Sequence, residues 1–193
     1  HERLVRRHGM GLSGLILSPV AGVDYQLVWD LLAEHRVPLV QLGLEVPASP
    51  AALTVRQDTL LSGRMAAELL SHFPGPAAVM IGNRQTVDHD EKLRGFQAEA
   101  NRRGLKIIQV CEHQDDAKLG YQMARQLLQE HPEVQGVYIA TDNFSGVFRA
   151  IKQHDRVGRV KVVATGVFPE IREAMDQGLV HFALDQRMAG QGE

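Results

Sequence analysis

The densest run of side chains that could do chemistry is residues 88–91, where Asp88, His89, Asp90 and Glu91 follow one another. Carboxylate oxygens and imidazole nitrogens are common ligands of zinc and related metals. The nine histidines nevertheless include no His-Glu-x-x-His pair and no other standard ligand spacing. Acidic residues are also favoured in the first turn of a helix, because the helix dipole is positive there. We therefore predict no metal site and interpret this run as a solvated loop that leads into a helix.

Several common catalytic and cofactor-binding motifs are missing from the chain. There is no Gly-x-Gly-x-x-Gly after the first apolar run, no Gly-x-x-x-x-Gly-Lys-Ser/Thr phosphate loop and no Gly-x-Ser-x-Gly turn to present a nucleophile. No nucleophile and base stand at a recognisable spacing either. We therefore predict that the protein is not an enzyme and that it needs no cofactor.

Polar residues that follow short apolar runs are the remaining candidates for a binding site. They lie at Ser18-Pro19, residues 82–91, Thr141-Asp142-Asn143, residues 165–167 and Asp185-Gln186-Arg187. In a doubly wound sheet of parallel strands, ligands bind beyond the carboxyl ends of the strands. If the apolar runs are such strands, these polar residues are where a ligand should be sought.

Two periodicities alternate along the chain. Short apolar runs bounded by Gly, Pro or polar residues are typical of strands buried on both faces, and they occupy residues 14–18, 38–43, 77–82, 106–111, 136–140 and 160–164. Longer segments with apolar residues at helical spacing predict helices over residues 24–35, 60–73, 91–103, 118–130, 144–154 and 170–177. The alternation predicts an α/β fold with doubly wound parallel sheets.

The composition narrows the class of protein further. The 193 residues carry 21 Lys and Arg against 23 Asp and Glu, a net charge of −2, which provides no basic footprint for direct binding to nucleic acid. The single cysteine, Cys111, excludes an internal disulfide and favours a reducing compartment. The basic first residues lead into a Gly-rich stretch in place of a secretory signal's apolar core, and no run approaches the ~20 apolar residues of a membrane span. We therefore expect a cytoplasmic protein with no membrane contact.

Six groups of residues, spread over nearly the whole chain, share their order with a known family. They are Gly14-Leu-Ile-Leu-Ser-Pro19, Val37-Pro-Leu-Val40, Val55-Arg-Gln-Asp58 with Gly63-Arg-Met-Ala-Ala67, Leu93-Arg-Gly-Phe96, Gly136-Val-Tyr-Ile-Ala-Thr-Asp142 and Ala183-Leu-Asp-Gln-Arg187. In this order they resemble the effector-binding domain of LacI-family transcriptional regulators. The same fold serves periplasmic sugar-binding proteins.

The resemblance implies two lobes with a sugar-sized ligand between them and chain crossings near residues 57–59 and 185–186. Residues 59–184 would form one complete lobe. Residues 1–58 together with 185–193 would form only part of the N-terminal lobe, because the family begins its domain with an earlier strand, helix and strand. The family's helix-turn-helix and final segment have no counterpart here either, so we interpret the chain as a fragment.

The resemblance also implies ligand-binding residues in this sequence. The family usually places an Arg three residues before the Gly-Phe pair, and here that position is Lys92, which keeps the charge without the planar two-pronged donor. Gln186 matches the family's hinge Gln, and Asp88 near the start of the same helix as Lys92 is a further candidate. The ordinary alternatives are an exposed helix lysine for Lys92 and a helix N-cap for Asp88.

A second group of implied ligand residues follows the run at 136–140. Where the family often has Asn-Asp, this chain has Thr141, Asp142 and Asn143, whose hydroxyl, carboxylate and amide suit the hydroxyls of a polyol. The same residues could instead cap the next helix. The Asp that many relatives carry after the following strand is absent, since Thr165-Gly-Val-Phe-Pro169 stands there, so the sequence does not identify the ligand.

On this basis the sequence predicts the ligand-sensing domain of a LacI-type regulator. A small sugar-like effector would shift the lobes and so change the operator affinity of a DNA-binding domain that this chain lacks. LacI-family regulators form dimers that hold two DNA-binding domains at a fixed spacing, so the resemblance implies a homodimer. The alternative is a periplasmic sugar-binding protein of an ABC transporter, which has the same fold and is typically monomeric.

Overall fold

The computed structural model describes residues 12–20, 22–46, 48–186 and 190. The chain divides into two compact units, His1–Gln57 with Arg187–Glu193 and Asp58–Gln186. These boundaries lie one and two residues from the lobe boundaries that the resemblance implies, and each unit has its own parallel sheet.

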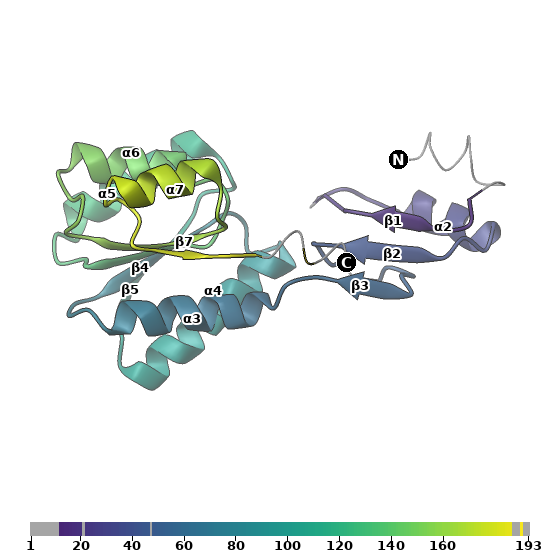
Figure 1. The fold of residues 1–193 in the computed structure, drawn as a ribbon, viewed down its shortest axis with the longest axis horizontal. Helices are drawn as coiled ribbons and strands as arrows, with labels where there is room; N and C mark the ends of the chain where they lie inside the picture. The colour runs from purple at the N-terminus through teal and green to yellow at the C-terminus, as the bar shows by residue number, and fades with distance from the viewer. Residues whose placement is uncertain (1–11, 21, 47, 187–189, 191–193) are drawn as a thin grey trace. The chain divides into compact units, whose positions relative to one another are not determined.

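The first unit is a small sheet with a helix packed on it (Figure 1). Its elements are β1 (Leu15–Leu17), α2 (Gln26–Glu34), β2 (Leu39–Leu42) and β3 (Leu53–Val55), with strand order β1-β2-β3. The helix buries Val28, Trp29 and Leu32 in a cluster with Leu17 and Leu39 of the strands. Trp29 is therefore a core residue of this unit.

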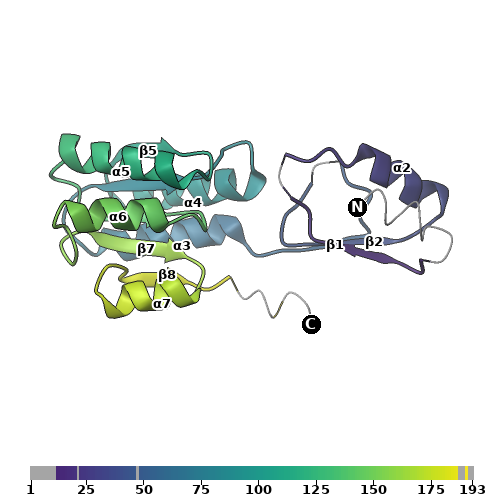
Figure 2. The same cartoon turned by 90° about the horizontal axis from the view of Figure 1, so that it is seen from above.

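The second unit is a five-stranded parallel sheet with strand order β5-β4-β6-β7-β8, and Figure 2 shows it from above. Its elements are α3 (Thr59–Ser71), β4 (Ala77–Ile81), α4 (Val87–Arg103), β5 (Ile107–Glu112), α5 (Ala117–Glu130), β6 (Gly136–Ile139), α6 (Ser145–Gln153), β7 (Lys161–Thr165), α7 (Pro169–Asp176) and β8 (Phe182–Leu184). The predicted α/β fold with parallel sheets is confirmed. The edge strands β3 and β8, each three residues long, are missing from the predicted strands, whereas the equally short edge strand β1 lies within the predicted apolar run at residues 14–18.

Helices cover both faces of this second sheet, as Figure 1 shows, with α3 and α4 on one face and α5, α6 and α7 on the other. Every residue of β4 is fully buried, and its side chains alternate between the two clusters, Val79 toward α3 and α4 and Met80 toward α5 and α6. A central strand covered on both sides has no solvent face, which is why it reads as an unbroken apolar run. No helix of the described residues has the length and apolar character of a membrane span.

Helices α3 and α4 cross at two glycines. A Cβ added at Gly63 would lie 1.9 Å from the carbonyl oxygen of Lys92, and one added at Gly95 would lie 2.0 Å from the carbonyl oxygen of Leu60. Only glycine permits backbones to approach this closely. The crossing therefore fixes α4, including the position of Lys92, on the sheet.

Candidate functional site

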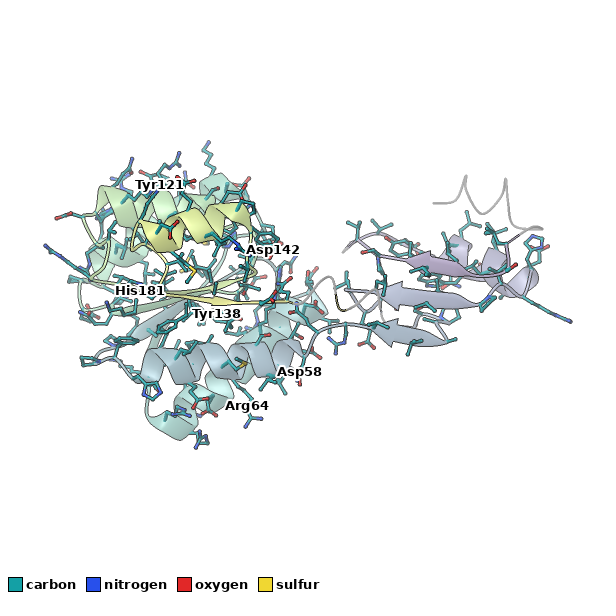
Figure 3. All side chains as sticks on the ribbon, in the orientation of Figure 1. Asp58, Arg64, Tyr121, Tyr138, Asp142 and His181 are labelled. Carbon is teal, nitrogen blue, oxygen red and sulfur yellow. The ribbon has the colours of Figure 1, made fainter. Side chains whose placement is uncertain are left out.

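The carboxyl ends of β4, β5 and β6 form the candidate site. The chain runs from β4 outward to β5 and then crosses to β6 on the other side of β4, so the topological switch point lies between β4 and β6. Ligands of doubly wound sheets bind at such a point. Figure 3 shows Asp142 at this edge of the sheet, whereas His181, which precedes β8, lies toward the opposite edge.

Lys92 is a buried cation at this edge. Phe96, one helical turn further on, stacks on Tyr138 of β6 with ring centroids 5.4 Å apart and so holds α4 against the end of the strand. Lys92 itself is 4% exposed, and its Nζ donates to the carbonyl oxygen of Ala140 at 3.5 Å. An ammonium has three donors, and this long contact is the one hydrogen bond that Lys92 makes among the described residues. The alternative of an exposed helix lysine is therefore wrong.

The electrostatic surroundings of Lys92 combine burial with negative charge. Burial is the largest influence and lowers the pKa of the Lys92 ammonium, while Asp142, Asp88 and Asp115 each oppose this by favouring the charged form. Three carboxylates thus surround one buried cation, so the charges of this edge are mixed and predominantly negative.

Asp115 is a central residue of the site that sequence reasoning missed. Its carboxylate lies over Gly82 at the end of β4, where a Cβ would stand 2.2 Å from the Asp115 Oδ1. The hydroxyl of Thr141 donates to the same oxygen at 2.5 Å, and the Asn143 side chain donates to the backbone oxygen of Asp115. Gln114 and Asp115 both have φ of +54°, a left-handed turn that is uncommon without glycine. Strain of this kind persists only where its surroundings hold it, and it clusters at functional sites.

The three predicted residues after β6, Thr141, Asp142 and Asn143, therefore have different roles. Thr141 is buried and uses its hydroxyl proton on Asp115, while its oxygen accepts from the Asn143 backbone N–H at 3.2 Å. Thr141 and Asn143 thus hold the Asp115 loop in place. Asp142 is exposed, and the N-cap residue of α6 is Phe144, so the alternative that Asp142 caps this helix is wrong.

The acidic run at residues 88–91 lies within α4 and not in a solvated loop. The N-cap is Thr86, so Asp88 is not a cap, and Asp88 and Asp90 occupy the first turn as the helix dipole favours. Glu91 accepts a hydrogen bond from the hydroxyl of Thr59 on α3. No three His, Cys, Asp or Glu side chains gather in a metal-holding arrangement in the part of the chain that the structure describes.

Two histidines lie beside Asp115. The Nδ1 of His89 accepts from the backbone N–H of Asn83 at 3.0 Å and lies 4.0 Å from Asp115 Oδ2. His113, at the end of β5, is fully buried, and neither of its ring nitrogens has a hydrogen-bond partner among the described residues. Burial is the largest influence on both rings and lowers their pKa values, so both are neutral at pH 7.

These histidines predict that the protein loses stability as the pH falls below neutrality. An unfolded histidine takes up its proton near pH 6.5, whereas the folded rings bind it only at lower pH. The unfolded state therefore binds more protons between pH 7 and the lowered folded pKa values, and each such proton costs about 1.4 kcal/mol of stability per pH unit. Urea unfolding at pH 7.5 and at pH 5.5 should give a lower stability at the acidic pH. His113→Phe should flatten this dependence, and a stability that is equal or higher at pH 5.5 would contradict it.

Gln186 is the last residue of the second unit and follows the edge strand β8, two strands from β6. It is half-buried. Its role toward a ligand stays a prediction, as do the ligand contacts of Asp88, Lys92 and Asp142.

The site as a whole offers charged and polar groups that can bind a ligand. It offers a buried ammonium with unused donors and the carboxylates of Asp115 and Asp142 as acceptors. The one cysteine, Cys111, is buried within the sheet, and burial raises the pKa of its thiol to about 11, which makes it a poor nucleophile.

Curated proteins with related sequences bind or import sugars. The chain is 25% identical over 193 residues to the D-ribose/D-allose-binding protein of Pseudomonas aeruginosa, covering 89% of the chain and 60% of that protein. It is 22% identical over 172 residues to the ribose import binding protein RbsB of Escherichia coli, covering 87% of the chain and 58% of that protein. The chain thus spans about three fifths of the length of these relatives.

Solved structures share the fold over almost the whole chain. A periplasmic ribose ABC transporter protein from Conexibacter woesei superposes with a TM-score of 0.89 at 21% identity, over 99% of the chain and 66% of that protein. A periplasmic solute-binding protein from Actinobacillus succinogenes with bound D-allose superposes with a TM-score of 0.86 at 19% identity, over 99% of the chain and 71% of that protein. The family model described as periplasmic binding protein domain matches residues 9–193, and the chain belongs to this family.

Proposed function

We propose that this chain is part of a binding protein that holds a small neutral sugar for uptake by a transporter. The sugar would lie at the carboxyl ends of β4 and β6. The observation that carries the proposal is Lys92, a buried ammonium whose one hydrogen bond to the described residues is a long contact to Ala140. A buried charge with unused donors is costly. Sugar oxygens would supply the missing acceptors.

The site presents charges of both signs to a ligand, three carboxylates and one ammonium. An anion would meet Asp88, Asp115 and Asp142, and a cation would meet the ammonium of Lys92. A sugar hydroxyl both donates and accepts hydrogen bonds. One sugar can therefore accept a hydrogen bond from Lys92 and donate one to Asp115 or Asp142. The relatives named above, which bind or import ribose and allose, support this class of ligand.

The same relatives favour transport over transcriptional regulation. Both are named as sugar-binding or import proteins, and both structural matches are described as periplasmic. The LacI-type regulator, with its cytoplasmic location, homodimer and operator DNA, is therefore the competing hypothesis. Light scattering on the intact protein at micromolar concentration separates the two, since transport predicts a monomer and regulation a dimer.

A sugar panel tests the proposal directly. D-ribose, D-allose, D-glucose and D-galactose are added separately to the intact protein, and its melting temperature is measured. A sugar at 100 times its Kd should add about 2.7 kcal/mol of stability. If pentoses, hexoses and their deoxy derivatives all leave the melting temperature unchanged, the proposal is wrong.

Asp142→Ala should weaken sugar binding by about tenfold or more, because a hydroxyl that donates to Asp142 would lose its partner. The melting temperature without sugar should stay unchanged, because Asp142 is exposed and does not cap α6. Calorimetric titration measures the affinity. Asp176→Ala, which removes an exposed carboxylate at the end of α7, is the matched control and should bind normally. Normal affinity in Asp142→Ala would remove Asp142 from the site.

A further inference from the structure

The carboxyl end of β7 differs chemically from the ends of its neighbours. The loops after β4, β5 and β6 carry carboxylate, amide, imidazole and hydroxyl groups. In residues 165–168, which comprise the last residue of β7 and the three that follow it, Thr165 is the one polar side chain. It is 1% exposed, and its hydroxyl donates away from the edge to the carbonyl oxygen of Ile139 at 3.0 Å. This part of the edge therefore offers a ligand no polar side chain.

Gly166 cannot be replaced by a side chain that would restore polarity there. Its φ is +83°, in the left-handed region that favours glycine. A Cβ at this position would lie 2.4 Å from Cε2 of Phe168. The ring of Phe168 thus occupies the space that a polar side chain at residue 166 would need.

Two phenylalanine rings together form an apolar surface at the ends of β6 and β7. Phe168 stacks on Phe144 with centroids 6.4 Å apart and planes 24° apart, and Phe144 in turn contacts Phe148 at 5.0 Å. Phe144 and Phe168 are both half-buried. Both also occupy helix N-cap positions, of α6 and α7, where Ser, Thr, Asp and Asn are the favoured residues. Helix capping therefore does not explain why these two positions carry aromatic rings, which also pack against the apolar core under α5, α6 and α7.

We propose that the sugar presents carbon rather than a hydroxyl to Phe168, so that the preferred ligand is a deoxysugar. This inference rests on the proposed function of the same edge. The ends of β4 and β7 are two strand spacings apart, about 10 Å, which is comparable with the size of one monosaccharide. A sugar held by Lys92 and Asp115 would then extend over β6 to the rings. A hydroxyl placed there would lose water without gaining a partner, whereas a methyl or methylene group would be buried favourably against the ring.

Matched sugar pairs test this preference. The intact protein is titrated by calorimetry with L-fucose and L-galactose, L-rhamnose and L-mannose, and 2-deoxy-D-ribose and D-ribose, each pair differing by one hydroxyl. In at least one pair the deoxy member should bind tenfold or more tightly than its hydroxylated partner. Phe168→Asn should remove this preference, and Asn is a favoured N-cap residue for α7. A thermal melt without sugar checks that the variant remains folded after it loses the contacts of the ring. Phe73→Asn replaces a half-buried phenylalanine two residues after the end of α3; it is the control and should keep the preference.

Two results would overturn the inference. One is that the hydroxylated member binds as tightly as the deoxy member, or more tightly, in every pair. The other is a deoxy preference that persists in Phe168→Asn. In both cases sugar binding itself remains and the proposed function stands. If none of the six sugars or the earlier panel binds, the proposed function fails and this inference fails with it.

Discussion

Lys92→Met should abolish sugar binding while the protein remains folded. The variant keeps the apolar stem of the side chain and removes the ammonium, and with it the donors that a sugar would use. Hydrogen bonds to a charged group contribute about 1.5–3 kcal/mol each, so losing two of them should weaken binding by about 100-fold or more. Folding should not suffer, because Lys92 makes one long hydrogen bond within the part of the chain that the structure describes, and its burial as a charge is costly. Calorimetric titration with the sugar that binds best, together with a thermal melt, measures both effects.

Two further variants make the Lys92 result specific. Lys92→Arg keeps the charge and adds a planar donor fork, and it should retain binding. Lys118→Met removes an exposed lysine from the first turn of α5 and should bind as the unmodified protein does. If Lys92→Met binds sugar with undiminished affinity, the buried ammonium is not part of the site.

Gly63→Ala should destabilise the protein by about 3 kcal/mol or more. Alanine is the better helix former by about 1 kcal/mol, so helix propensity alone predicts the opposite sign. The clash should dominate, because the new Cβ would lie 1.9 Å from the backbone oxygen of Lys92 and 2.8 Å from the backbone nitrogen of Phe96. Backbone atoms cannot rotate away, so α3 and α4 must separate. Urea unfolding measures the loss.

Gly120→Ala is the matched control for this prediction. Gly120 lies within α5, and a Cβ there would meet the ring of His113 at an ordinary contact distance of 3.6 Å. It should leave the stability unchanged or raise it by up to about 1 kcal/mol. Equal stability of Gly63→Ala and Gly120→Ala would show that the α3–α4 crossing is looser than the structure has it.

The fold was predictable from the sequence because its central strands are covered on both faces. The six predicted apolar runs all contain strands, since a strand such as β4 has no solvent face and so no polar residues within it. The helix over residues 91–103 begins four residues earlier than predicted, at Val87, because its first turns are polar. The strands β3 and β8 are three residues long, and their pairing with β2 and β7 decides their structure.

The candidate site was predictable only in part. Lys92, Thr141, Asp142 and Asn143 lie at the predicted edge, because the carboxyl ends of parallel strands meet there. Asp115 was missed, although it follows the apolar run at 106–111 by a few residues. Its position depends on the left-handed turn and on the absence of a side chain at Gly82, which lies 33 positions earlier and carries no local signal.

A crystal structure of the intact protein with its best-binding sugar tests the central claim most directly. Electron density for the sugar is expected over the carboxyl ends of β4 and β6, with a sugar oxygen within hydrogen-bond distance of the Nζ of Lys92. A sugar bound elsewhere, with the Nζ of Lys92 still contacting only the carbonyl oxygen of Ala140, would contradict it.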